Sequence, residues 1–211
     1  MFYVYNNYHK YHKYQFHTRL KLKGQNVQVV DQMKILGTII TNKLSWNENC
    51  DFLIKKVNAR MQLLRKVWSF GSTPEEMVQL WKTFCRSILE QSCVLWDGGL
   101  TAENRRYLER TQKTFARLVL EEDFKNYKQA LSLLQIPTLQ DRRKELTLRF
   151  AETGIMDGTL TDLFPKKRKR HTMETRKGNV YKVTHANTSR LKNSPVITMQ
   201  RMLNEQQKNI N

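Results

Sequence analysis

Hydrophobic residues recur every three or four positions through much of the central chain, which is the spacing of one face of an α-helix. The first such stretch follows Ser45 and Glu48, which stand in the register of an N-terminal capping box, and Gly71 follows its end. Its apolar positions are Trp46, Cys50, Leu53, Val57, Met61, Leu64 and Trp68. The pattern predicts a long amphipathic helix.

A second helix is predicted after Gly71. Pro74 suits a first helical position, and Ser72 with Glu75 stands in capping-box register around it. The run 97–99 (Asp-Gly-Gly) is expected to end this helix. The expected buried stripe comprises Met77, Leu80, Trp81, Phe84 and Ile88.

Three further helices are predicted between Thr101 and Ile155. Thr101 is a suitable N-cap for the first of them, and a shorter helix is expected over 127–134. Thr138 with Asp141 caps a last long helix that reaches about Ile155. The apolar face of the helix after Thr101 is formed by Leu108, Thr111, Phe115, Leu118 and Val119.

The N-terminal part shows the two-residue alternation that is typical of strands. Leu20 and Leu22 alternate with cationic residues, and the run 24–26 (Gly-Gln-Asn) supplies a turn. Further strands are expected at Val27, Val29 and the run 35–40. We therefore expect a small β-hairpin or a three-stranded element.

These elements predict a mainly α fold. A biased leader at 1–16 precedes the β element at 17–44, and a helical bundle follows at 45–157. Residues 158–211 are expected to form a basic, weakly ordered tail with at most a short helix near 199–203. Because hydrophobic residues concentrate between Val27 and Ile155, the core is expected there and not at the two ends.

The charge balance indicates an anionic partner. The chain of 211 residues has 37 Lys and Arg against 19 Asp and Glu, a formal net charge of +18, and a compact protein this basic repels itself unless a polyanion binds it. Nucleic acid fits best and an anionic membrane surface second, but no apolar run approaches the ~20 residues of a membrane span.

The three cysteines, Cys50, Cys85 and Cys93, do not have the spacing of a disulfide framework, which favours a reducing, intracellular compartment. They are expected to be core residues and not metal ligands. The histidines of the N-terminal region, His9, His12 and His17, lie in or beside the biased leader and form no metal motif with the cysteines.

The sharpest binding candidate is a row of four cations on the helix after Thr101. Arg106, Arg110, Lys113 and Arg117 fall within roughly 60° of one another on a helical projection, opposite the apolar face. Glu109 is the only acidic residue between Arg105 and Arg117. The row can lie along a phosphate backbone; the alternative is a solvated helix face. Cations on the first helix are added to this nucleic-acid-binding set: Lys55, Arg65 and Lys66.

A dense basic run follows the helical region. It comprises Lys166, Lys167, Arg168, Lys169 and Arg170. This composition is typical of a nuclear-localisation signal or a nucleic-acid patch, and equally of a tail that has no specific partner.

Catalytic signatures are absent from the sequence. It contains no Gly-rich phosphate loop and no nucleophile elbow. Its aspartates are isolated from one another, whereas two-metal phosphoryl transfer needs clustered carboxylates. We therefore assign no catalytic residue and no metal ligand, and expect the chain to catalyse nothing alone.

Five segments of the chain follow one another in a recognisable order: 34–46 (KILGTIITNKLSW), 80–96 (LWKTFCRSILEQSCVLW), 108–118 (LERTQKTFARL), 133–143 (LLQIPTLQDRR), and the pair 193–195 with 202–204. Taken together, they resemble the region after the catalytic palm in reverse transcriptases of non-LTR (LINE-type, jockey-like) retrotransposons. The resemblance runs from about His17 to Asn204. The chain has Ile35 and Gln91 where that family usually has an aromatic residue, and Ser87 where proline is common.

The resemblance implies a truncated RNA-directed DNA polymerase. The parent enzyme copies RNA into DNA with two Mg²⁺ ions on palm aspartates, which would lie before residue 1. What remains would be the last palm strands and a thumb-like bundle that grips primer–template nucleic acid without base specificity. Nucleic acid, and the missing palm and fingers, are the implied partners. The alternative is a non-catalytic architectural nucleic-acid-binding domain or a protein-interaction helical domain.

Overall fold

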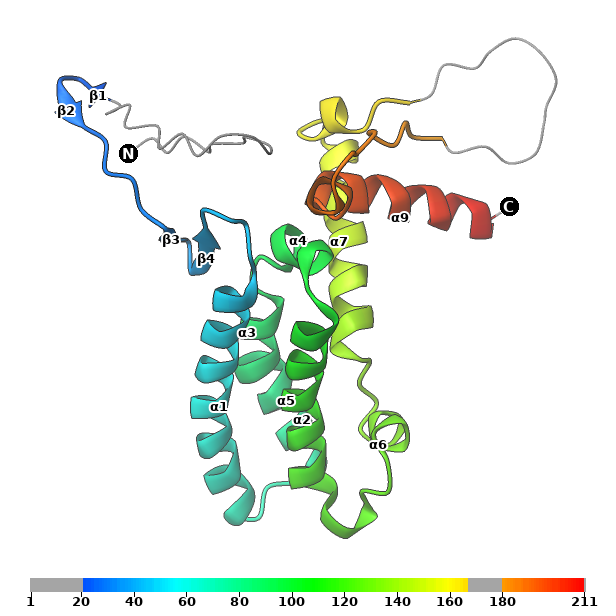
Figure 1. Ribbon diagram of the computed structural model, residues 1–211. Coiled ribbons are helices and arrows are strands. Elements are labelled where there is room, and N and C mark those ends of the chain that lie inside the picture. Colours follow the sequence, from blue (N-terminus) through cyan, green and yellow to red (C-terminus); the bar gives the residue numbers. More distant parts are fainter. Residues whose placement is uncertain (1–20, 167–179, 211) are drawn as a thin grey trace.

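A computed structural model describes residues 21–166 and 180–210, which form a mainly helical molecule with two small antiparallel hairpins on the N-terminal side (Figure 1). The expected fold class is confirmed.

The strands are β1 (Lys21–Leu22), β2 (Gln25–Asn26), β3 (Gln32–Ile35) and β4 (Thr38–Thr41). The longer helices are α1 (Asn47–Ser69), α2 (Pro74–Leu80), α5 (Ala102–Leu120), α6 (Tyr127–Leu133), α7 (Leu139–Met156) and α9 (Pro195–Ile210). The short helical segments are η1 (Trp81–Arg86), α3 (Ser87–Glu90), α4 (Cys93–Trp96), η2 (Asp97–Gly99), η3 (Glu121–Asp123), η4 (Thr161–Leu163) and α8 (Ser189–Lys192).

Both hairpins turn through two residues in the left-handed region. Lys23 and Gly24 join β1 to β2 with φ of +47° and +79°, and Leu36 and Gly37 join β3 to β4 with φ of +46° and +86°. Such turns match the twist of the strands that they connect. The strands expected in the run 35–40 are therefore present at Ile35 and at 38–40, and the chain reverses between them.

Two details of the β element differ from expectation. The first turn lies at 23–24 and not at 24–26, and the chain between the hairpins, which includes the expected strands at Val27 and Val29, is extended without pairing. Val29 is 88% exposed. An apolar residue in an unpaired connection has no sheet face to cover, and alternation alone could not show this.

Helix α1 buries the expected stripe but starts differently. Cys50, Leu53, Val57, Met61 and Leu64 are buried. The Ser45–Glu48 capping box does not form, because the N-cap is Trp46 and makes no side-chain cap. Instead, the Ser45 amide donates to Thr41 Oγ1 at 2.9 Å, and Thr41 Oγ1 donates to the Ser45 carbonyl at 3.1 Å. This hydrogen-bonded turn delays the helix by one residue.

Helix α2 has a capping box one residue later than expected. The Glu76 amide donates to Thr73 Oγ1 at 3.3 Å, and the Thr73 amide donates to Glu76 Oε2 at 2.9 Å. The Ser72–Glu75 pairing is wrong. Because Pro74 is the first helical residue, the residue directly before it must be the N-cap.

A π-helical turn at η1 shifts the buried stripe that continues from α2. Met77, Trp81 and Ile88 are buried as expected, but Cys85 is buried at the position expected for Phe84, which is 50% exposed. One extra residue in the turn rotates the following side chains around the axis. The helix also ends before 97–99, because Ser92 has a left-handed φ of +52° and a new short helix, α4, begins at Cys93.

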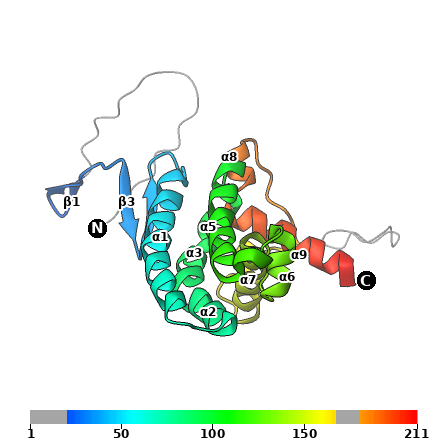
Figure 2. The same ribbon diagram turned by 90° about the horizontal axis from the view of Figure 1, so that it is seen from below.

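Helices α1 and α5 pack side by side in the same direction and are tied at both ends. Near their first turns, Asn104 Nδ2 donates to Asn47 Oδ1 at 2.8 Å. Beyond their last turns, Trp68 Nε1 donates to Glu121 Oε1 at 2.7 Å. The chain of α2, η1 and α3 returns between them (Figure 1). Seen from below, α5 lies between α1 and α7 (Figure 2).

Helices α5 and α7 begin with the expected caps, Thr101 and Thr138, and α6 is capped by Asn126, for which no cap was predicted. Thr101 and Thr138 accept from the amides of Asn104 and Asp141 at 3.1 and 3.0 Å. The predicted helices at these positions are confirmed. The main core, formed where the apolar faces of α1, α2–α3 and α5 meet, includes all three cysteines, which are buried and unpaired as expected.

The C-terminal part contains a longer helix and more buried apolar residues than expected. Helix α9 contains the short helix expected near 199–203 but runs over sixteen residues and crosses α7 at one end of the bundle (Figure 1). A second small core lies there, formed by Ala151, Phe164, Tyr181, Met199 and Leu203. The expectation that residues beyond Ile155 bury no core is therefore wrong.

Buried amides explain why this helix was hard to predict. Asn204 accepts from the Tyr181 amide at 2.9 Å and donates to its carbonyl at 3.1 Å. Gln200 accepts from the Thr184 amide at 2.9 Å and donates to the Leu163 carbonyl at 2.8 Å. These side chains satisfy the backbone of an extended segment, so a buried helix face carries polar residues that a search for apolar spacing ignores.

Candidate nucleic-acid interface

Helix α5 presents its four-cation row on the side away from the core. Arg106, Arg110 and Arg117 are exposed and Lys113 is half-buried. All four line one open hollow of about 670 Å³ over the outer face of α5, closed on one side by Tyr127 of α6 and Gln140 of α7. The structure therefore brings together the residues that helical spacing grouped, and adds the neighbouring helices as a wall.

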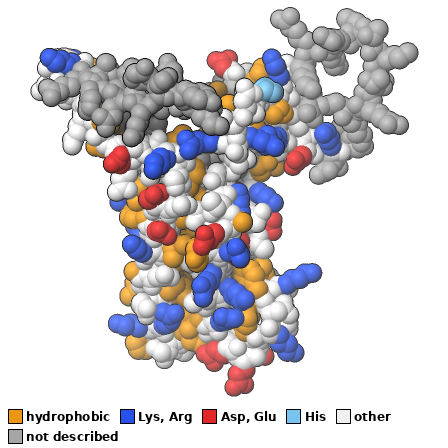
Figure 3. All heavy atoms as spheres, in the orientation of Figure 1, with side chains coloured by type: hydrophobic (Ala, Val, Ile, Leu, Met, Phe, Trp, Pro, Cys, Tyr) orange, Lys and Arg blue, Asp and Glu red, His pale blue; other side chains and the backbone are white. Residues whose placement is uncertain are grey.

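The row is not neutralised by carboxylates. Among the described residues, none of Arg106, Arg110, Lys113 and Arg117 lies within ion-pair distance of an Asp or Glu. Figure 3 shows Lys and Arg side chains gathered over the middle of α5, with acidic side chains at the end of the bundle below. An unneutralised row keeps its charge available to a polyanion.

The two carboxylates that line the hollow are bound to neutral donors. Glu109 accepts from the Tyr127 hydroxyl at 2.6 Å and from the Gln140 amide in the first turn of α7 at 2.8 Å. Glu103 accepts from the Tyr107 hydroxyl at 3.2 Å. Burial, and then the hydrogen bond to Glu109, raise the pKa of the Tyr127 phenol, which stays protonated and keeps donating. Glu109 thus fastens the wall of the hollow to α5.

Gln112 fixes the same wall from inside. Its side chain is fully buried, and Nε2 donates to the Tyr127 hydroxyl at 3.1 Å and to the Pro137 carbonyl at 2.8 Å. Its Oε1 accepts from Trp81 Nε1 at 3.3 Å. One amide therefore connects α5 to η1, α6 and the start of α7, and the hollow keeps its shape when the exposed row is altered.

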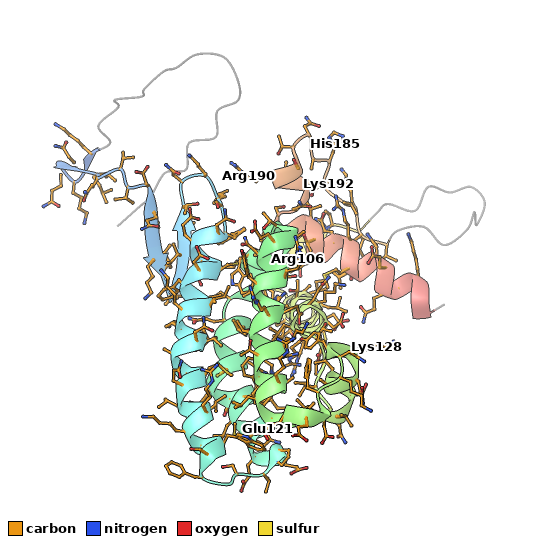
Figure 4. All side chains as sticks on the ribbon, turned by 60° about the horizontal axis from the view of Figure 1, so that its bottom comes forward. Arg106, Glu121, Lys128, His185, Arg190 and Lys192 are labelled. Carbon is orange, nitrogen blue, oxygen red and sulfur yellow. The ribbon has the colours of Figure 1, made fainter. Side chains whose placement is uncertain are left out.

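Arg117 is oriented by an aromatic neighbour. Its guanidinium carbon lies 5.1 Å from the centre of the Phe124 ring. A cation over a ring face is attracted by the ring's quadrupole and keeps its N–H groups free at the edges. Arg106, near the other end of the row, is labelled in Figure 4.

The other predicted binding residues lie elsewhere. Lys55, Arg65 and Lys66 are exposed on α1, but none of them lines the hollow over α5. Lys166 is exposed and pairs its backbone with Tyr181 in an isolated bridge. Lys167, Arg168, Lys169 and Arg170 lie outside the described residues, as do His9, His12 and His17.

A buried ion pair was missed by the sequence analysis. Asp97 accepts from Arg143 Nε at 2.7 Å, and its carbonyl accepts from Arg105 Nη2 at 2.7 Å. Arg143 falls four residues from Leu139 and from Thr147 on the buried face of α7. A charged residue on a buried stripe needs a buried partner, and that spacing was the available signal.

The buried or half-buried carboxylates of Asp97 and Glu90 are paired with arginines and are not free to bind Mg²⁺. Asp97 is held by two arginines, and Glu90 accepts from Arg142 at 3.1 Å and pairs with Arg86 at 3.0 Å. Over 21–166 and 180–210, no group of three or more His, Cys, Asp or Glu is arranged to hold a metal ion.

Comparison of the chain with protein-family models, with curated proteins and with solved structures finds no match. Within the described part of the chain, no helix combines the length and the apolar character needed to cross a membrane.

Proposed function

We propose that the helical region binds duplex nucleic acid, RNA–DNA hybrid included, by its phosphates, and that it is the thumb-like part of a non-LTR retrotransposon reverse transcriptase. The observation that carries the binding proposal is the α5 row: four cations share one open hollow with no carboxylate in ion-pair distance among the described residues. Phosphate contacts position a protein on nucleic acid without reading bases.

The length of the row suits a phosphate backbone. From Arg106 to Arg117 the helix rises about 16 Å at about 1.5 Å per residue. One strand of a duplex carries a charge about every 3.4 Å along its axis, so the row spans about five nucleotides. Each bound phosphate releases condensed counterions, which makes the affinity steeply dependent on salt.

The assignment to a reverse transcriptase is supported by the five resembling segments and by the element order, a hairpin followed by a helical bundle. We further propose that this chain alone incorporates no nucleotide, and that palm and fingers segments supply the catalytic carboxylates and Mg²⁺. The basic run 166–170 supports a nuclear location as part of the same proposal.

A salt titration tests the binding proposal. Arg110→Gln with Arg117→Gln removes two contacts, and the slope of log affinity against log salt should fall by about 1.8 for an RNA–DNA duplex. The matched control, Lys56→Gln with Arg149→Gln, removes the same charge from exposed positions on α1 and α7, outside the hollow and outside the predicted binding set, and should change the slope less. An unchanged slope in the α5 variant would favour a protein-interaction domain with incidental charge, and equal changes in both variants would contradict the assignment of binding to the α5 row.

Primer extension tests the second part. The chain with a primed RNA template, deoxynucleotides and Mg²⁺ should give no extension. Templated incorporation by the chain alone would contradict the proposal.

A further inference from the structure

A second hollow, of about 560 Å³, lies beyond the N-terminal end of α5. Its apolar floor is formed by Leu44, Trp46 and Leu95, and its rim by the segment that leads into and through α8. His185, Asn187 and Arg190 lie on this rim and are exposed. Sequence spacing could not indicate this hollow, because about 50 residues separate its first lining segment from the second, and about 90 residues separate the second from the third.

Trp46 differs from the other tryptophans of the chain. The indole N–H groups of Trp68, Trp81 and Trp96 donate to Glu121, Gln112 and the Gln91 carbonyl respectively. The half-buried Trp46 indole makes no hydrogen bond within the described residues. It thus offers an aromatic ring surface to whatever occupies the hollow.

Gly99 fixes the Trp46 ring in place. A Cβ atom at Gly99 would lie 2.6 Å from Trp46 Nε1 and 2.7 Å from Cδ1. Because only glycine permits this approach, the Nε1–Cδ1 edge of the indole lies against the backbone just before α5, and the half-buried ring also lines the hollow. A rigid aromatic platform loses little conformational freedom when a planar ligand stacks on it.

The hollow favours an anionic, planar occupant. The described residues that line it include Arg190 and His185 but no Asp or Glu. Arg190 makes no ion pair within the described chain. Aromatic platforms beside cations are the common means of holding unpaired nucleotides, because every base has a ring face and every link has a phosphate.

The hollow continues the α5 row. Figure 4 places Arg190, Lys192 and His185 beyond the end of α5 that carries Arg106, and Figure 2 also shows α8 beyond that end. Gly99, which lies against Trp46, is only three residues before the first residue of α5. A strand whose phosphates follow the row toward Arg106 is therefore directed toward this hollow.

We propose that this hollow binds an unpaired base of a single-stranded extension of the duplex held on α5, with the base against Trp46 and its phosphate near Arg190. This inference rests on the proposed function, since the row supplies the adjoining duplex. Because the cationic row on α5 leads toward the hollow, we propose nucleic acid as its occupant and not an apolar peptide.

The test compares three RNA–DNA ligands on the wild-type chain: a blunt duplex, the same duplex with a three-nucleotide single-stranded extension, and that duplex with an abasic extension. Stacking predicts about tenfold tighter binding of the extended duplex than of the blunt one. The abasic extension, which keeps the phosphates, should lose most of this gain. Equal affinities for the base-bearing and abasic extensions would overturn the inference.

Two variants test whether the tighter binding of the extended duplex arises at this hollow. Trp46→Leu keeps an apolar side chain at this place and should abolish the tenfold gain. Trp68→Leu, at the far end of α1, is the matched control and should retain it. If Trp46→Leu still binds the extended duplex more tightly than the blunt duplex, the proposed site is wrong. The comparison with the abasic extension uses only the wild-type chain, so it tests the inference even if Trp46→Leu fails to fold.

Failure of this inference and of the proposed function give different results. Blunt-duplex affinity and its salt slope report the α5 row alone. If the blunt duplex binds and the extension adds nothing, the row stands and the base site is wrong. If the blunt duplex fails to bind, the proposed function is wrong whatever the extension does.

Discussion

Asp97 Oδ1 lies 2.7 Å from Arg143 Nε, and both side chains are buried although they are 46 residues apart in the chain. Arg143 also places its guanidinium carbon 5.7 Å from the centre of the Trp96 ring. Its two terminal nitrogens have no hydrogen-bond partner in the described structure. The pair joins the segment before α5 to the second turn of α7.

Replacing Asp97 with alanine should destabilise the fold by about 3–5 kcal/mol, because it leaves the Arg143 charge buried without compensation. Urea unfolding followed by circular dichroism measures this change. The control Asp123→Ala removes an exposed carboxylate and should change the free energy of unfolding by less than about 0.5 kcal/mol. Joint replacement of Asp97 and Arg143 with apolar residues should recover much of the loss; similar effects for Asp97→Ala and Asp123→Ala would contradict the buried pairing.

Alanine at Gly98 should loosen the C-terminal helices. An added Cβ would lie 2.7 Å from both the Asn193 carbonyl oxygen and Thr198 Oγ1, and the backbone oxygen cannot move without shifting the junction of α8 and α9. We expect a loss of about 1–3 kcal/mol. Hydrogen exchange should quicken in α9 while α1 and α5 keep their protection. Unchanged exchange in α9 would mean that the helix does not pack there.

The buried thiols predict a stability that falls in alkaline solution. Burial raises the pKa of Cys50 to about 12 and the pKa values of Cys85 and Cys93 to about 11. In the unfolded chain thiols ionise near pH 9, so between about pH 9 and 11 the unfolded state loses protons that the folded state keeps. Each thiol then lowers the free energy of unfolding by up to about 1.4 kcal/mol per pH unit.

Urea unfolding at pH 8, 9.5 and 10.5 measures this dependence. Since lysines and tyrosines titrate in the same range, the wild-type slope is compared with that of Cys85→Ala, which should be shallower by up to one thiol's share. Iodoacetamide at pH 8 should react slowly with the folded chain and quickly in urea. Fast native labelling would show that the thiols are not buried.

Sequence spacing predicted α1, α5, α6 and α7 because their signals are local. Thr101 and Thr138 cap within three residues, and the Met61 and Leu64 positions follow directly from 3.6 residues per turn. The α5 row was predicted for the same reason, since four side chains on one straight helix need no tertiary information to share a face.

Features that depend on distant contacts were not predictable in this way. Nothing in the sequence around Phe84 indicates the π turn, which places Cys85 in the core and leaves Phe84 half-exposed. Helix α9 was underestimated because Gln200 is buried by hydrogen bonds to distant backbone. The hollow at Trp46 exists only once α8 packs against the chain before α5.

The shared direction of α1 and α5 brings two helix starts to one end of the bundle, where Asn104 donates to Asn47. Aligned peptide dipoles place partial positive charge at a helix start, and the effect is confined to the first turn. Because α2 with α3, and α7, run the opposite way, the dipoles largely offset one another over the whole bundle, and the contribution that remains is the local one near Trp46. In the proposed complex this start of α5 attracts a phosphate through its own backbone, and charge-neutralising substitutions in the row leave that contribution in place.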